Sequence, residues 1–66
     1  MKLNESAINL ARAKRCMTVT ELTQSAGISG ASLRNGYKRS LGAALIGRIA
    51  VALDVDVETI IVQEGE

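Results

Sequence analysis

The segment MTVTELTQSAGIS, residues 17–29, carries the start and end signals of one short helix and the start signal of a second. Thr18 is a residue type that caps helix N-termini, and Glu21 three positions later completes a capping box. Gly27 suits the left-handed conformation in which many helices end, and Ser29 can cap the helix that follows. The segment therefore predicts two helices joined by a tight, glycine-containing turn.

The basic stretch LRNGYKRS, residues 33–40, follows, and it allows two endings for the second of these helices. If Gly36 is the C-terminal cap, the residues after it form a basic loop. If Gly36 lies inside the helix, Lys38 falls on its outward side. The Asn35-Gly36 pair is a strong turn signal, so both endings remain open at this point.

Three further helices are expected around this pair. Asn4 can cap a first helix, an apolar stripe marks a fourth, and Asp56 can cap a short fifth. We therefore predict an all-α fold, in which one domain over residues 1–66 forms a compact bundle of about five short helices with a helix-turn-helix at about residues 18–38. The expected helices span about residues 4–15, 18–26, 29–37, 42–53 and 56–62.

The expected core is aliphatic, because Tyr37 is the sole aromatic residue of the chain. The helical spacing places these residues inward: Leu3, Ala7, Leu10, Ala11, Leu22, Ala26, Leu33, Leu45, Ile46, Ile49, Ala50, Leu53, Val57, Ile60 and Ile61. Cys16 is the single cysteine, so no disulfide forms within the chain, and we expect it to be a small, partly buried apolar residue.

Charge is distributed unevenly along the chain, although the net charge is only +1. Residues 1–48 carry all eight basic residues and two acidic ones, whereas residues 49–66 carry five acidic residues. No acidic residue occurs between Leu22 and Leu53, where four basic residues fall. A stretch that carries only positive charge indicates a surface that binds a polyanion. The alternative is an ordinary solvated surface.

Several classes of function are not expected from this composition. The chain has no histidine and one cysteine, so it lacks the residues of a zinc site or of a cysteine–histidine nucleophile. It also lacks a glycine-rich phosphate loop, and its acidic residues do not cluster as a catalytic pocket would need. We expect no enzymatic activity, no cofactor, no metal and no small-molecule ligand. No apolar run is long enough to span a membrane and no signal-peptide pattern occurs, so we expect a cytoplasmic protein.

The order of these features resembles one family of DNA-binding domains. The pair Ala11-Arg12, the segment 17–29 and LGAALIGRIAVALDVDVETII, residues 41–61, together resemble the lambda-repressor/Cro-like (XRE-type) helix-turn-helix family over roughly residues 8–62. The resemblance implies a transcriptional regulator of the Cro/repressor type that binds double-stranded operator DNA through its third helix. It also implies that Arg12 ties the first helix to the rest of the domain.

The resemblance also implies which residues meet DNA. Thr18 and Thr20 would face phosphates, whereas Ser29, Ser32 and the outward residues of the third helix would face bases and flanking phosphates. The expected DNA-binding set is Thr18, Thr20, Ser29, Ala31, Ser32, Arg34, Asn35, Tyr37, Lys38 and Arg39. Arg34 and Asn35 have side chains that can make bidentate base contacts. Tyr37 is equally suited to packing with its hydroxyl at the surface.

Two departures from the family pattern favour an alternative function. Val19 stands where family members commonly have a glutamine that binds a phosphate, and Gly30 and Ala31 stand where larger polar residues are usual. The alternative is a phage-type anti-repressor or modulator, which uses this fold to bind another repressor protein. The apolar tail Ile60, Ile61 and Val62 can serve a homodimer or such a partner, or can close the core of the monomer.

Overall fold

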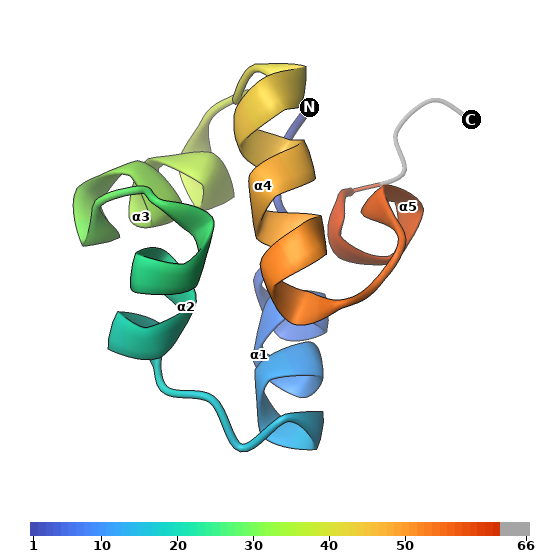
Figure 1. Cartoon of the computed structure of the whole chain (residues 1–66). Helices are drawn as coiled ribbons and strands as arrows, with labels where there is room; N and C mark the ends of the chain where they lie inside the picture. Colours follow the sequence, from blue (N-terminus) through green and yellow to red (C-terminus); the bar gives the residue numbers. More distant parts are fainter. Residues whose placement is uncertain (63–66) are drawn as a thin grey trace.

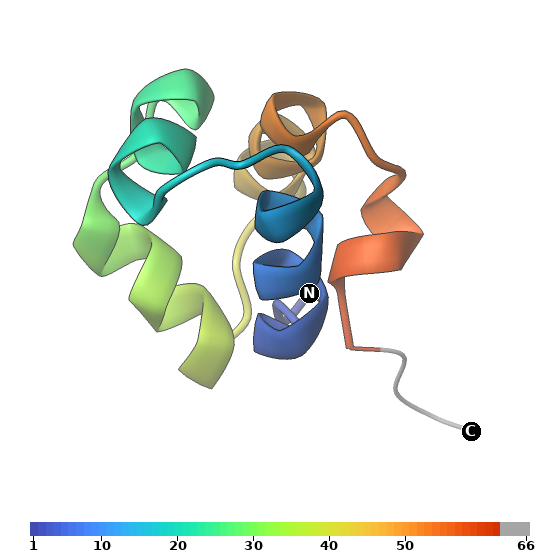
Figure 2. The same ribbon diagram turned by 90° about the horizontal axis from the view of Figure 1, so that it is seen from below.

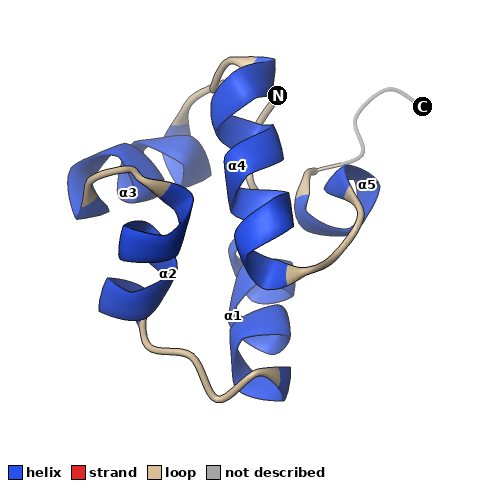
Figure 3. Cartoon of the chain, viewed as in Figure 1, coloured by secondary structure: helices blue, strands red, loops and turns tan. Residues whose placement is uncertain are grey.

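The computed structural model describes residues 1–62, and residues 63–66 lie outside the described part. The described chain folds into five helices without a strand, which confirms the predicted all-α bundle (Figures 1 and 3). The helices are α1 (Glu5–Lys14), α2 (Val19–Ala26), α3 (Gly30–Lys38), α4 (Ala43–Leu53) and α5 (Val57–Ile60). Helices α1 and α4 form the middle of the bundle, with the α2–α3 pair on one side and α5 on the other (Figures 1 and 2).

Local signals account for the ends of α1 and α2. The Asn4 side chain accepts a hydrogen bond from the Ala7 backbone N–H at 3.2 Å. In the capping box, Thr18 Oγ1 accepts from the Glu21 N–H at 3.1 Å, and Glu21 Oε1 accepts from the Thr18 N–H at 2.8 Å. Gly27 ends α2 in the left-handed conformation with a φ of 71°. These ends form as the sequence predicts, because each depends on neighbouring residues alone.

Cys16 follows Arg15, the C-cap residue of α1, and adopts the left-handed conformation with a φ of 53°. Its own N–H donates to the Ala13 carbonyl at 3.2 Å, and the Met17 N–H donates to the Arg12 carbonyl at 2.9 Å. The thiol is exposed. The expectation of a partly buried Cys16 was therefore wrong, because this residue turns the chain away from α1 instead of packing beneath it.

Exchange of Cys16 for glycine should raise the free energy of unfolding by roughly 0.5–1 kcal/mol, because glycine adopts a positive φ without the steric cost that a side chain brings. Urea denaturation followed by circular dichroism measures this gain. The matched control is Ala13→Gly on the exposed side of α1, which should lower stability by about 1 kcal/mol. Loss of stability in both variants would contradict the left-handed assignment.

The core is aliphatic and draws on every helix. Its buried members are Leu3, Ile8, Ala11, Leu22, Ala26, Leu33, Ile46, Ile49, Ala50, Leu53 and Ile60. Leu10 was expected to face inward, but it is 60% exposed and Ile8 takes the inward position. The predicted face was wrong because Leu3 precedes α1 and so does not set the phase of that helix. Ala7 and Leu45 are only half-buried.

Residues 1–4 form an extended segment that connects the end of α3 to the end of α5. The Leu3 N–H donates to the Gly36 carbonyl and the Asn4 N–H donates to the Ile60 carbonyl, both at 2.8 Å. Leu3 also pairs with Ile61 in an isolated antiparallel bridge. This pairing ends α5 at Ile60, two residues before the predicted end, because Ile61 is drawn into extended backbone.

The same segment decides how α3 ends. Gly36 lies inside α3 and is buried, so the alternative in which it caps the helix was wrong. A Cβ atom at Gly36 would stand 2.6 Å from Leu3 Cδ1 and 2.7 Å from Leu41 Cδ1. Gly36 therefore allows the close approach of the N-terminal segment to α3, and it does not mark a turn.

Candidate nucleic-acid interface

Helices α2 and α3 form a compact unit joined by residues 27–29. Helix α2 packs against α4 and also against α3, so the unit is held on the bundle mainly through its first helix. The buried residues of α3 are Leu33 and Gly36, which leaves the opposite side of this helix facing solvent. The arrangement is a helix, a short glycine-containing turn and a second helix with an open outer side.

The open side of α3 carries one continuous stripe, which we call the α3 stripe. It consists of Ala31, Arg34, Asn35 and Lys38, all of which are exposed. Their spacing of three, one and three residues places them on one face over two helical turns. Lys38 belongs to the stripe because α3 continues through Gly36. Arg39 follows as the exposed C-terminal cap residue.

The first turn of α3 is covered by Arg34. Its Nη1 atom lies 3.5 Å from the place that a Cβ atom on Gly30 would occupy. The guanidinium therefore folds back toward the start of the helix, where the missing side chain leaves room for it. The surface of this turn therefore includes the guanidinium of Arg34 beside the small residues.

The two serines at this turn are hydrogen-bonded to each other. The Ser29 hydroxyl donates to Ser32 Oγ at 3.1 Å and accepts from the Ser32 N–H at 3.0 Å. Ser29 is thus engaged as the N-cap of α3. The bond between the two hydroxyls uses one of their two protons, so one hydroxyl proton of the pair is left for an outside acceptor.

The cations of the α3 stripe carry no compensating charge. Within residues 1–62, no ion pair involves Arg34, Lys38 or Arg39. The Asn35 side chain likewise has no hydrogen-bond partner in this part of the chain, and the Arg39 N–H donates to the backbone carbonyl of Asn35 at 2.7 Å. These side chains are available to an anionic ligand without breaking an existing contact.

Tyr37 does not belong to the stripe. It is half-buried and packs against the core cluster. Burial raises the pKa of its hydroxyl, the charge of Glu5 raises the pKa further, and Arg12 acts in the opposite direction. The hydroxyl is therefore protonated at neutral pH and lies within the electrostatic influence of α1. This placement agrees with a packing residue whose polar tip reaches the surface.

The start of α2 presents Thr18 and Thr20, which are both exposed. The Thr18 oxygen is occupied by the capping box, and Val19 between them is exposed as well. Arg12 stands behind this region: its Nη1 donates to the Met17 carbonyl at 3.1 Å and its Nη2 donates to Asn9 Oδ1 at 2.8 Å. Arg12 thus links α1 to the residue that precedes Thr18.

The apolar tail is divided between core and surface. Ile60 is 0% exposed, so its side chain closes the core of the monomer and is not accessible to a partner. Ile61 is half-buried against the same core, and Val62 is exposed. Of the three predicted interface residues, only Ile61 and Val62 have accessible surface.

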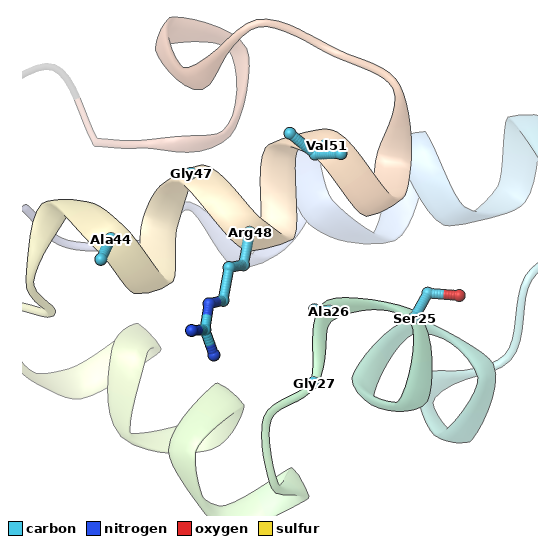
Figure 4. A pocket seen from close by; sticks show the side chains of 7 residues that line it. All are labelled: Ser25, Ala26, Gly27, Ala44, Gly47, Arg48 and Val51. Carbon is cyan, nitrogen blue, oxygen red and sulfur yellow. The ribbon is translucent and has the colours of Figure 1, made fainter.

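One surface feature was missed by the sequence analysis. An open hollow of about 630 Å³ lies between α4 and the end of α2, and its rim carries Val51 and Arg48 of α4 (Figure 4). Val51 is 80% exposed, more than any other large apolar residue among residues 1–62. The sequence did contain a signal for this hollow. Ala44, Gly47 and Val51 are small or apolar residues at helical spacing on the side of the helix that faces away from its buried stripe.

Comparison of the chain with protein-family models, with curated proteins and with solved structures finds no match. Among the described residues, no group of three or more potential ligands is placed to hold a metal ion. The helices of this part of the chain are too short or too polar to cross a membrane. A functional proposal therefore rests on the residues and geometry of the chain itself.

Proposed function

We propose that the chain is a small, non-enzymatic transcriptional regulator of the Cro/repressor type, which binds operator DNA by placing α3 in the major groove. The observation that carries the proposal is the α3 stripe, which combines two unpaired cations and a free amide on the second helix of a helix-turn-helix. Arginine, asparagine and lysine are side chains with which proteins read base edges and hold phosphates. Such a regulator acts in the cytoplasm on double-stranded DNA.

The stripe divides by position into two kinds of contact. In a docked helix-turn-helix the N-terminal part of the second helix meets the base edges. Arg34 would reach them because its guanidinium extends back to Gly30, and Asn35 is the next residue of the α3 stripe. Lys38 and Arg39 at the end of the helix, together with the threonines at the start of α2, are exposed and would contact phosphates. Contacts to phosphates release counterions, so the affinity should fall steeply as the salt concentration rises.

The double variant Arg34→Ala/Lys38→Ala should bind generic duplex DNA about tenfold or more weakly at low salt. Generic duplex offers no specific base to Arg34, so both cations should neutralise phosphates there, and the plot of log affinity against log salt concentration should be shallower by about 2. Fluorescence anisotropy of a labelled duplex, titrated at several salt concentrations, measures both quantities.

The matched control is Lys2→Ala/Lys14→Ala, which removes the same charge outside the α2–α3 unit. The control should retain most of the affinity. Equal losses in the two double variants would show that net charge, and not the α3 stripe, determines binding. A wild-type protein without measurable affinity at about 50 mM salt would end the DNA-binding proposal.

A second candidate function is a phage-type anti-repressor or modulator that binds another repressor protein. The exposed apolar side chain of Val19 favours it, because this side chain offers nothing to a phosphate at the place where the first helix would cross the backbone. Addition of a candidate repressor to the same anisotropy assay distinguishes the two functions. Binding of that repressor in the absence of DNA supports the second.

A further inference from the structure

Three exposed side chains along α4 and at its C-cap differ in charge: one is a cation, one is apolar and one is a carboxylate. Arg48, Val51 and Asp54 follow one another at intervals of three residues, and all three are exposed. We call them the α4 row. Arg48 and Val51 lie opposite the buried side of the helix, which consists of Ile46, Ile49, Ala50 and Leu53, and Asp54 follows α4 as its left-handed C-cap residue. The row therefore presents an apolar centre with a cation on one side and a carboxylate on the other.

Val51 also separates two hollows of different charge. The hollow toward α2 is lined on the α4 side by Ala44, Gly47 and Arg48, and Figure 4 shows Arg48 reaching across it toward the α2–α3 turn. The hollow on the other side, of about 370 Å³, is lined by Ala50, Val51, Asp54, Val55 and Asp56. The first hollow contains a cation and the second contains two carboxylates.

The α4 row is complementary to itself. Consider two chains related by a two-fold axis that passes beside Val51 and is perpendicular to the row. Val51 of one chain then meets Val51 of the other, and the two charges occur in the reverse order in the second chain. Arg48 of each chain then faces Asp54 of the other, because the two residues line the hollows on opposite sides of Val51.

We propose that this surface of α4 binds a second copy of the chain and forms a symmetric homodimer. A contact of this kind uses the same patch on both subunits, and it is favourable only if the patch complements itself. The α4 row satisfies this condition in charge, and its apolar centre Val51 meets its own copy. The proposed dimer thus uses a different part of the chain from the tail at residues 60–62.

The charges of the row are available for such a contact. Arg48 has no ion pair within residues 1–62. Asp54 lies 3.8 Å from Arg15, but both side chains are exposed, so this pair contributes little and leaves carboxylate surface for another cation. Asp54 also caps the C-terminus of α4, where the negative end of the helix dipole adds to its attraction for an arginine.

Sedimentation equilibrium of the whole chain without DNA tests the proposal, with loading from about 10 µM to about 1 mM. The wild type should change from monomer to dimer within this range, and Val51→Asp should remain monomeric throughout. The matched control is Leu10→Asp, which alters another exposed apolar residue on α1 and should dimerise as the wild type does. Circular dichroism confirms that each variant is folded.

A charge exchange tests the pairing itself. Arg48→Glu and Asp54→Lys should each weaken dimerisation about tenfold or more, because each places like charges opposite one another twice. An equimolar mixture of the two variants should restore dimers, since both charge pairs are then attractive. A loss of folding cannot produce such a restoration.

Three outcomes would overturn the proposal: a wild type that is monomeric at the highest loading, a Val51→Asp variant that dimerises normally, or a mixture that remains monomeric. If this surface binds an unrelated protein instead, the wild type should be monomeric at the highest loading. Because DNA is absent and the α4 row lies outside the α2–α3 unit, these results are independent of the proposed function.

Discussion

Replacement of Ile60 by alanine should lower the free energy of unfolding by about 2–5 kcal/mol, the usual cost of removing a large aliphatic side chain from a core. A domain of this length has a total stability of roughly 3–10 kcal/mol, so the substitution should remove a large part of that stability. Ile60 is 0% exposed, and its carbonyl accepts the Asn4 N–H at 2.8 Å. The loss would therefore affect α5 and the N-terminal segment together.

The physical reason for so large an effect is the length of α5. A helix of four residues cannot form on propensity alone, so its packing against α1 and α4 must hold it in place. Urea denaturation measured by circular dichroism gives the change. The neighbouring exposed residue provides the control, because Thr59→Ala should change stability by less than about 0.5 kcal/mol. A similarly small effect at Ile60 would show that α5 is not part of the cooperative core.

Exchange of Gly36 for alanine should destabilise the protein by roughly 1–3 kcal/mol, which is the typical cost of an added methyl group in a packed site. Helix propensity alone predicts the opposite, since alanine is favoured over glycine in a helix by about 1 kcal/mol. The added Cβ would meet Leu3 Cδ1 at 2.6 Å and Leu41 Cδ1 at 2.7 Å. Leu3 is buried and bonded to the Gly36 carbonyl, so it cannot move aside without loosening the N-terminal segment.

Gly47 is the matched control for this prediction. It also lies inside a helix, but a Cβ atom there would have no atom within 4 Å. Gly47→Ala should therefore raise stability by about 0.5–1 kcal/mol through propensity. Thermal unfolding of both variants beside the wild type measures the contrast. Changes of the same sign at the two positions would contradict the close packing of Gly36 against the N-terminal segment.

Sequence reasoning succeeded where a structure depends on residues within one or two turns. The capping box of Thr18 and Glu21, the cap at Asn4 and the left-handed Gly27 were all predicted, and all are present. The amphipathic stripe of α4 was predicted for the same reason, because its period is a property of the helix itself. The residues of the α3 stripe were also singled out in advance, since their spacing places them away from Leu33.

Sequence reasoning failed where a distant residue decides the outcome. The Asn35-Gly36 pair has the composition of a turn, yet α3 runs through it because Leu3, thirty-three positions earlier, packs on the glycine. Leu10 and Ile8 are equally apolar, and only the packing of α1 on its neighbours selects Ile8 for the core. Periodicity offers candidates in such cases, and long-range contacts choose among them.

The fold class, the start of α1 and both ends of α2 thus follow from local order along the chain, because caps, periodicity and left-handed residues act within a few positions. The continuation of α3 to Lys38, and with it the length of the cationic stripe, depends on an N-terminal segment that is brought to α3 from the other end of the chain. The burial of Ile60 and the exposure of Val51 depend likewise on which helices pack side by side. Contacts of this kind form only when the chain is folded, since van der Waals packing acts over a few ångströms in space and is independent of separation along the sequence.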